Sequence, residues 1–283
     1  MQRYKILHRT YYNYSGDVIL GAHNLLLRPR ENYELRIESF NIKTTPSSTL
    51  LWHRDVEGNS VAIASFDTPT SQLVIESEVI IQQFNESPLD FIVADYAVSY
   101  PFLYQDDENI SLFPYRTLAD AETIDVVNRW ISNFWKFDEQ IQTYTLLQSI
   151  AEYIHMTLSY TVREEPGVQS ARQTLSLKSG SCRDFALLFM EAAKCLGLAS
   201  RFVSGYIYAP LMVDEIGSTH AWAEVYLPGA GWKGFDPTIG KIVGSDHIAV
   251  AVARLPESVP PISGSFTGLP ESSLCVGVWI SLC

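Results

Sequence analysis

Apolar and polar residues alternate at every second position through much of the first third of the chain. The clearest runs are residues 61–66 and 73–81, whose β-branched and aromatic side chains favour strands. Turn-forming residues separate such runs at 15–17, 46–48 and 57–59. Since alternation places one face of a strand in a core and the other in solvent, residues 1–88 are predicted to form a β-sandwich-like domain.

The hydrophobic period becomes helical in the second half of the chain. The first helical stripe consists of Leu146, Leu147, Ile150, Ala151, Ile154 and Leu158. A second amphipathic helix begins at residue 182 and ends near Gly197, a residue type suited to a helix C-terminus. Strands are predicted after it at 201–208, 219–227 and 232–236. Helices followed by antiparallel strands give residues 119–283 an α+β architecture.

Two segments fall outside these patterns. Residues 89–118, with Pro88 just before them and Pro101 and Pro114 within them, are predicted to form an irregular connecting segment. The acidic residues 106–109 within it lack the spacing of a calcium-binding loop and are interpreted as a solvated loop. The final residues, 272–283, match no motif, but their run at 276–280 is strand-like and could complete a sheet. We assign them to the α+β part.

Charge and composition narrow the class of protein. Twenty basic against thirty-two acidic side chains give a net charge of −12, which argues against binding to nucleic acid or to an anionic membrane. The chain has neither an apolar N-terminal signal region nor an apolar stretch of roughly 18 residues, so we expect a cytoplasmic protein. Its four cysteines show neither CxxC spacing nor a disulfide framework, and reduced thiols are expected.

Cys182 is the candidate nucleophile. Ser181 and Asp184 have the spacing of a capping box, which makes Cys182 the first residue of a helix. The unpaired N–H groups and the positive dipole end at that position favour a thiolate and can bind an oxyanion. Taken alone, a cysteine at a helix start more often has only an inert packing role. The other cysteines are interpreted as bystanders: Cys195, Cys275 and Cys283.

His220 is the candidate base. Alternation along residues 219–226 puts polar and aromatic side chains on one face and small apolar ones on the other. The first face comprises His220, Trp222, Glu224 and Tyr226. His155, predicted on a helix, and His247, predicted in a loop, are poorer candidates.

Asp236 is the candidate partner of His220. Glu224 lies on the same strand as His220 but roughly 13 Å away at about 3.3 Å per residue, beyond hydrogen-bond reach. A hairpin centred near Pro228 instead sets Asp236 directly opposite His220, with Cβ atoms about 4.5–5.5 Å apart. The alternative is that Asp236 only begins a turn with the proline that follows it.

Together Cys182, His220 and Asp236 supply the nucleophile, the base and the orienting carboxylate of an acyl-transfer triad. Zinc binding is the competing use of these residue types, but no fourth ligand is evident, so neither a metal nor a cofactor is predicted. Trp222 and Trp232 are predicted to line the substrate cleft. Core packing is an equally good interpretation of both indoles.

Four segments occur in an order and spacing that are more specific than any one of them alone. They are REEPGV at 163–168, GSCRDFA at 180–186, RFVSGY at 201–206, and HAWAEVY at 220–226 continuing to FDPT at 235–238. These segments resemble the transglutaminase-like superfamily, in particular its bacterial branch of cysteine proteases. Residues 8–11 and 27–30 resemble the β-rich domain that precedes the core in that branch. The resemblance implies a papain-like α+β core with Cys182, His220 and Asp236 as its triad.

The predicted function is cleavage of a peptide, isopeptide or other amide bond in a protein or peptide substrate, through a thioester on Cys182. A transglutaminase, in which an amine resolves the same thioester, is the first alternative because it uses the same triad. A binding or scaffold protein that keeps the fold without turnover is the second. The complete triad argues against that second alternative.

Overall fold

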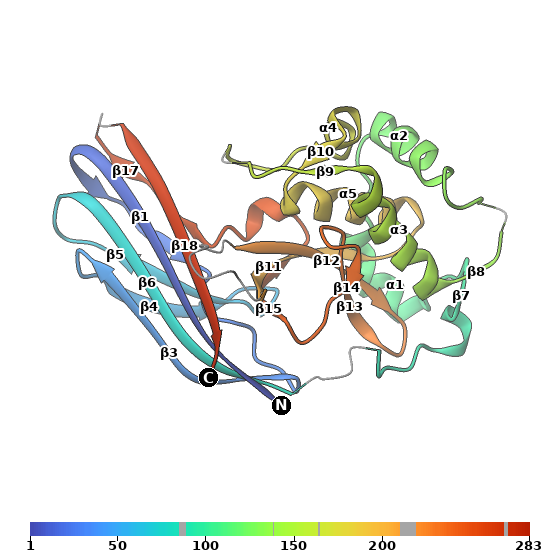
Figure 1. Ribbon diagram of the computed structural model, residues 1–283, viewed down its shortest axis with the longest axis horizontal. Coiled ribbons are helices and arrows are strands. Elements are labelled where there is room, and N and C mark those ends of the chain that lie inside the picture. Colours follow the sequence, from blue (N-terminus) through green and yellow to red (C-terminus); the bar gives the residue numbers. More distant parts are fainter. Residues whose placement is uncertain (85–88, 138, 164, 210–218, 269–270) are drawn as a thin grey trace.

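The computed structural model describes residues 1–84, 89–137, 139–163, 165–209, 219–268 and 271–283. The chain forms a β-rich part and an α+β part, which lie side by side (Figure 1). Two predicted features reach beyond the described residues: Glu164 of the first superfamily-like segment, and residues 85–88 at the end of the predicted N-terminal domain.

Two sheets form the N-terminal domain. The larger contains β1 (Gln2–Leu20), β3 (Leu35–Thr45), β6 (Thr70–Gln83), β17 (Phe266–Thr267) and β18 (Ser272–Leu282). The smaller contains β2 (His23–Leu25), β4 (Thr49–Arg54), β5 (Ser60–Ser65) and β16 (Ile262–Ser263). Leu73 and Ile75 of the larger sheet pack with Leu25 and Ala62 of the smaller. The core therefore lies between the sheets, which confirms the β-sandwich-like prediction.

The turn predicted at 15–17 is instead a bulge inside β1. The pairing of β1 with β6 shifts register between Asn13 and Val18, and Val18 pairs with Thr70 beyond the shift. Because residues on both sides of the irregularity pair with β6, the strand continues to Leu20.

The C-terminal strand joins the N-terminal domain. Residues of β18 from Ser272 to Leu282 pair antiparallel with β1 from Tyr14 to Tyr4. We assigned this segment to the α+β part from the sequence, whereas its strand pairing lies in the larger sheet of the sandwich (Figure 1). The alternation of the segment predicts a strand, but it carries no information about which distant strand is the partner.

The connecting segment is more ordered than predicted. It contains β7 (Ser99–Tyr100), α1 (Asp106–Leu112) and short 3₁₀ turns at Asp95–Ala97 and Phe113–Arg116. The acidic residues interpreted as a solvated loop form the first turn of α1, and Glu108 accepts a hydrogen bond from the backbone N–H of Gln105 at 3.3 Å. Carboxylates at a helix N-terminus interact favourably with the helix dipole and with its unpaired N–H groups, which explains why this patch is helical.

Helices and an antiparallel sheet form the second domain, which confirms the α+β prediction. The helices are α2 (Ala121–Ile131), α3 (Thr143–Thr157), α4 (Ala171–Leu177) and α5 (Cys182–Cys195). The sheet has the order β14-β13-β12-β11-β15. Its strands are β11 (Ser200–Ile207), β12 (His220–Leu227), β13 (Gly231–Asp236), β14 (Lys241–Ile242) and β15 (His247–Ala253). Two short pairs complete the domain: β7 with β8 (Ile141–Gln142), and β9 (Ser159–Tyr160) with β10 (Ser179–Gly180).

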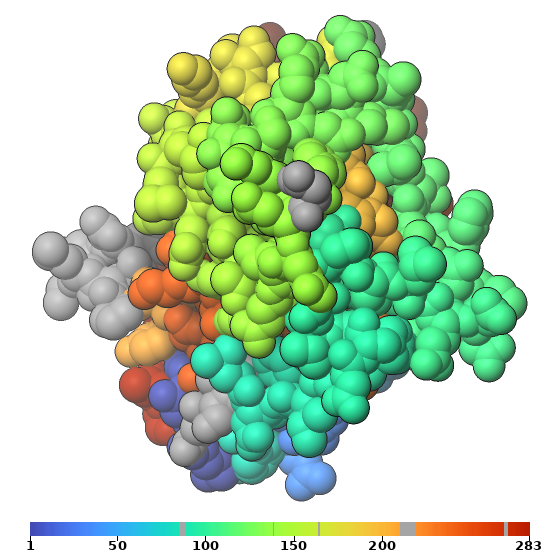
Figure 2. Space-filling model, turned by 90° about the vertical axis from the view of Figure 1, so that its right-hand side faces the viewer, coloured from blue at the N-terminus to red at the C-terminus, as the bar shows by residue number. Residues whose placement is uncertain are grey.

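Helix α5 is the buried helix of this domain. Its side chains Phe185 and Phe189 share a core with Ala223 and Phe235 of the sheet, and the rings of Phe189 and Phe235 stack at 5.4 Å. The helix ends at Cys195, and the predicted stop Gly197 follows its C-cap Leu196 with a φ of 77°, which suits glycine. The other helices lie around α5, so the segment from α1 to α4, green to yellow in Figure 2, forms most of the surface on that side.

The sandwich packs against the sheet of the second domain at β11 and β15. Tyr4 and Ile6 of β1 share an apolar cluster with Tyr206 of β11 and with Ile248 and Val250 of β15. Strand β15, at the edge of the second domain's sheet, therefore packs against the N-terminal domain. None of the helices in the described ranges combines the length and apolar content of a membrane-crossing helix, and the cytoplasmic location stays a prediction.

Candidate active site

Cys182 is the first residue of α5, as predicted, and its side chain is nearly buried, with 9% of the residue exposed. The helix start is built by Ser181 and Asp184. The Oδ2 of Asp184 accepts hydrogen bonds from the backbone N–H of Ser181 at 2.8 Å and from its hydroxyl at 2.9 Å. The thiol thus lies where the N–H groups of a first helical turn are available to a negative charge.

Asp184 also anchors the loop that precedes α4. Arg163 donates to both of its oxygens, at 2.8 and 3.0 Å, and the backbone N–H of Gln169 donates to Oδ1 at 2.7 Å. Arg183 donates to the backbone carbonyl of Arg163 at 3.1 Å. A Cβ at Gly180 would approach the Cβ of Asp184 to 2.8 Å, so glycine is needed there.

His220 and Asp236 are joined directly, as predicted. The Nε2 of His220 lies 2.6 Å from the Oδ2 of Asp236, and the backbone N–H of Thr238 donates to Oδ1 at 2.8 Å. Burial lowers the pKa of His220, but the hydrogen bonds with Asp236 and with the thiol of Cys182 outweigh it and raise the pKa to about 10. Both the carboxylate and the thiol therefore favour the protonated form of this imidazole.

The hairpin that brings them together has a different register from the predicted one. Glu224 pairs with Gly234 and Ala223 with Phe235, a shift of two residues that moves Asp236 away from the position directly opposite His220. Because a shift of two preserves the face of a strand, the Asp236 side chain stays on the face of His220 and reaches it diagonally. Glu224 is not the partner; it accepts from Arg201 at 2.7 Å.

His247, rated a poorer candidate, belongs to the same group. It opens strand β15 rather than lying in a loop, and only 4% of it is exposed. Its Nε2 lies 3.1 Å from the Oδ2 of Asp236, and its Nδ1 lies 2.7 Å from Asp246. The local sequence gives no signal for this contact, because it depends on β15 pairing with β11 beside β12.

The atoms of His220, Asp236 and His247 that could ligate a metal lie within 4.8 Å of one another. Their contacts of 2.6 and 3.1 Å are hydrogen-bond distances. Ligand atoms at about 2.0–2.2 Å from a tetrahedral zinc ion would stand roughly 3.3 Å apart, so a metal would require the two imidazoles to separate from the carboxylate. The prediction of a metal-free site stays a prediction.

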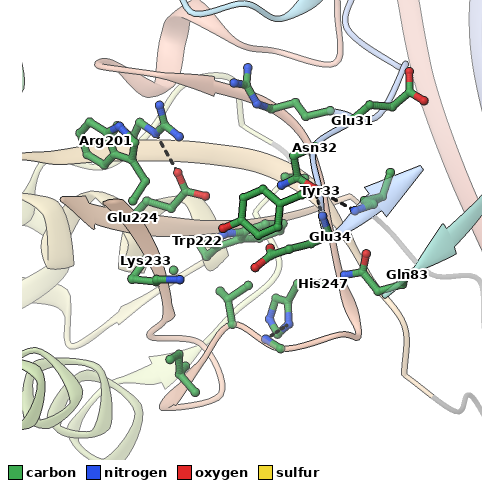
Figure 3. A pocket seen from close by; sticks show the side chains of 18 residues that line it. Glu31, Asn32, Tyr33, Glu34, Gln83, Arg201, Trp222, Glu224, Lys233 and His247 are labelled. Carbon is green, nitrogen blue, oxygen red and sulfur yellow. Dashed lines mark hydrogen bonds and ion pairs between the residues drawn. The ribbon is translucent and has the colours of Figure 1, made fainter. Parts of the chain in front are cut away.

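Trp222 and Trp232, the predicted cleft residues, line a pocket of about 260 Å³ between the two domains. Figure 3 shows Tyr33 and Glu34 of the N-terminal domain beside Trp222, with Lys233 and His247 lining the same pocket. Cys182 is not among the residues that line this pocket.

Trp222 is 1% exposed and contacts the His247 ring edge-on, with ring centroids 5.2 Å apart. The guanidinium of Arg201 lies 4.2 Å from the ring centroid of Trp232. Both indoles therefore have packing roles, and their contact with substrate stays a prediction.

In this α+β fold a cysteine begins the buried helix α5 and the candidate histidine begins strand β12 of the antiparallel sheet. This arrangement can be compared with that of known families. Comparison with known families identifies the class: residues 136–237 match the transglutaminase-like superfamily, and residues 4–82 match the bacterial transglutaminase-like N-terminal region. The resemblance drawn from the sequence is thus confirmed over these two ranges. This family match supports a cysteine-dependent enzyme.

Similar proteins cover nearly the whole chain. Uncharacterized proteins of Mycobacterium tuberculosis and Mycobacterium bovis are 26% identical over 290 residues, covering 96% of this chain and 90% of theirs. One from Mycobacterium leprae is 24% identical over 287 residues and covers 99% of each chain. The crystal structure of a "putative cysteine protease" from Cytophaga hutchinsonii has a TM-score of 0.75 at 16% identity, covering 99% of this chain and 90% of that one. That likeness shows the two-domain fold.

Proposed function

We propose that this protein cleaves a peptide, isopeptide or other amide bond in a protein or peptide through a thioester on Cys182. His220 is the base and acid of the reaction, and Asp236 orients His220. The observation that carries the proposal is that one nearly buried imidazole lies 2.6 Å from a carboxylate oxygen, and that the thiol that opens α5 is close enough to raise the pKa of this imidazole. The description of the Cytophaga hutchinsonii protein as a "putative cysteine protease" is consistent with this chemistry.

The reaction follows from the protonation states of these groups. His220 takes the proton of Cys182, and the thiolate attacks the carbonyl carbon, so an S–C bond forms while the oxyanion is held by N–H groups at the start of α5. The imidazolium then gives its proton to the leaving amine as the C–N bond breaks. Water attacks the thioester, its proton passes to His220, and the C–S bond breaks to release the acid and restore the thiol.

Asp236 acts in this sequence by holding His220. Burial alone would raise the pKa of Asp236, but hydrogen bonds from His220 and His247 outweigh burial and lower that pKa overall. The carboxylate therefore stays ionised. An ionised carboxylate at Nε2 fixes the tautomer in which the opposite ring nitrogen faces the thiol.

A peptide library scored for new termini tests the proposal. We expect turnover by the wild-type protein and none by Cys182→Ala, whereas Cys275→Ala, an exposed cysteine on β18, retains full activity. Equal turnover by the wild type and Cys182→Ala would contradict the proposal.

Amine transfer is the second candidate, because the family match is to the transglutaminase-like superfamily and the two reactions differ only in the nucleophile that resolves the thioester. Incubation with a glutamine-containing peptide and a labelled primary amine separates them. Incorporation of the amine identifies a transferase, and release of ammonia with free acid alone identifies a hydrolase.

A further inference from the structure

We propose that His247 is a positioning residue for the reaction at Cys182: it holds Asp236 at the same carboxylate oxygen as His220 and balances the charge of that carboxylate. The inference rests on the proposed function and deepens it, since it adds a fourth and a fifth group, His247 and Asp246, to the chain that begins at the thiol. Three consecutive contacts carry it: His220 with Asp236, Asp236 with His247, and His247 with Asp246.

First, both imidazoles carry a proton on the nitrogen that faces Asp236. Oδ2 of Asp236 receives both Nε2 atoms, that of His220 at 2.6 Å and that of His247 at 3.1 Å. A carboxylate oxygen only accepts hydrogen bonds, so both Nε2 atoms carry a proton. His220 is therefore fixed with its Nε2 proton on Asp236, and its Nδ1 is the nitrogen left to exchange a proton with Cys182.

The second step concerns the charge of His247. Its Nδ1 lies 2.7 Å from the Oδ1 of Asp246 and 3.3 Å from the backbone N of Gly244. A neutral ring would direct the lone pair of Nδ1 at the Asp246 carboxylate, whereas a protonated ring donates to it, and the shorter contact is the one to Asp246. Burial lowers the pKa of His247, but its hydrogen bonds to Asp236 and then Asp246 raise it overall, which agrees with an imidazolium.

The third step concerns burial. The side chains of Asp236 and His247 are 0% and 1% exposed, so water is not available to replace either hydrogen bond. A buried carboxylate that loses one of its hydrogen-bond donors moves or becomes protonated. Either change alters the orientation of the His220 ring. Trp222 packs against both imidazoles, with ring centroids 6.2 Å from His220 and 5.2 Å from His247, and restricts their rotation.

The charged groups near His247 come from several elements. His220 and Asp236 face it from β12 and β13, and Asp246 precedes it in the chain. Glu34 and Lys233 line the same interdomain pocket (Figure 3). Tyr4 of β1 interacts with Asp246, which together with burial raises the pKa of that phenol. Of these groups, Asp236 and Asp246 are the two in hydrogen-bond contact with His247.

Two substitutions separate the donor from the charge. His247→Gln keeps an N–H donor for Asp236 without a positive charge, and His247→Leu removes both. The matched control is His53→Gln, an exposed histidine on β4 in the other domain. Thermal unfolding establishes that each variant is folded, and the rate of Cys182 alkylation by iodoacetamide is then measured from pH 4 to 9 with peptide mapping.

We expect His247→Leu to slow alkylation of Cys182 at pH 6.5 by about tenfold or more. His247→Gln should recover most of that rate while its pH midpoint moves up by about half a unit or more, because a nearby positive charge has been removed from the thiolate's surroundings. A purely structural role would not shift the midpoint of a folded variant. His53→Gln should coincide with the wild type.

The outcomes distinguish the two proposals. If Cys182 of the wild type reacts rapidly and His247→Gln has the wild-type rate and midpoint, the role of His247 is overturned while the proposed function stands. If Cys182 of the wild type reacts no faster than Cys275, the proposed function fails. Should His247→Leu not fold, the midpoint of His247→Gln decides alone.

Discussion

At the scale of single residues, the site depends on the buried carboxylate of Asp236. It receives two imidazoles at one oxygen and a backbone N–H at the other, so each of its contacts fixes a different element. His220 connects this carboxylate to the thiol. Removing the imidazole breaks the connection, whereas removing only the charge of the carboxylate weakens it.

Substitutions of His220 and Asp236 should therefore slow the alkylation of Cys182 to different extents. We expect His220→Ala to slow alkylation of Cys182 near pH 6.5 by roughly a hundredfold, and Asp236→Asn to slow it less, by roughly tenfold. The asparagine keeps an acceptor for Nε2 but not the charge that raises the pKa of His220. Equal rates for the wild type and both variants, measured by mapping the alkylated peptide, would count against the triad.

The sequence predicts the identity of these residues better than their contacts. Cys182 is found from its capping box, and His220 from strand alternation, because both signals are local. His247 escapes detection, since its contact with Asp236 arises from the order of strands in the sheet. Asp184 is predicted as a cap, but its ion pair with Arg163 crosses 21 positions of sequence.

At the scale of elements, the start of α5 is built more strongly than a helix cap requires. Asp184 combines the cap of Ser181 with a buried ion pair to Arg163, whose side chain is 17% exposed against 0% for Asp184. Removing this carboxylate would leave the N-cap unsatisfied and the Arg163 guanidinium partly buried without its partner.

Asp184→Ala should consequently cost about 3 kcal/mol or more of unfolding free energy. The matched control is Asp120→Ala, which removes the N-cap of α2, where Asp120 accepts from the backbone N–H of Thr123 at 3.0 Å. Loss of that cap alone is expected to cost about 1 kcal/mol. Urea unfolding compares the two, and equal losses would show that the ion pair of Asp184 adds nothing.

The hairpin of β12 and β13 illustrates what element-level patterns can and cannot determine. Alternation correctly assigns each side chain of β12 to a face, but the register was predicted two residues away from the observed one. The turn sequence contains both proline and glycine residues, so it is compatible with more than one loop length. The predicted contact between Asp236 and His220 still forms, because an even shift of register keeps Asp236 on the same face of the sheet as His220.

At the scale of the whole molecule, the last strand and the first strand hold the sandwich against the second domain. Val278 of β18 is 1% exposed and shares a cluster with Ile6 of β1 and Tyr206 of β11. The C-terminal segment thus stabilises a contact between the domains although it lies far from both β1 and β11 in the sequence.

Val278→Ala should destabilise the protein by about 2 kcal/mol through loss of buried methyl groups. Val276→Ala, two positions earlier on the same strand and 36% exposed, should cost less than about 0.5 kcal/mol. The difference is measured by urea unfolding. A cost at position 276 equal to that at 278 would contradict the packing of β18 described here.

The interface between the domains should also respond to acid through His8. Its Nδ1 lies 2.9 Å from the hydroxyl of Tyr206, its Nε2 lies 3.0 Å from that of Thr10, and burial lowers the pKa of His8 to about 4. A histidine with a folded pKa below its unfolded value binds more protons when unfolded, so stability falls as the pH drops from about 6.5 towards 4.

Glutamine does not titrate. Between pH 7 and 4.5 we therefore expect the free energy of unfolding of the His8→Gln variant to fall by about 2–3 kcal/mol less than that of the wild type. The comparison of the two proteins removes the contributions of other titrating groups, including His220, whose raised pKa has the opposite sign. The same loss in both would mean that His8 is not buried in its neutral form.

The most direct test of the account is a comparison of the four cysteines in one protein. Wild-type protein is treated briefly with iodoacetamide at pH 6.5, and the alkylated fraction of Cys182, Cys195, Cys275 and Cys283 is measured by peptide mapping. Burial raises the pKa of Cys195 to about 11, so it should react slowest, while the exposed Cys275 and Cys283 serve as ordinary thiols. We predict that Cys182 reacts fastest although it is nearly buried; a rate at or below that of Cys275 would contradict its role as an activated thiolate.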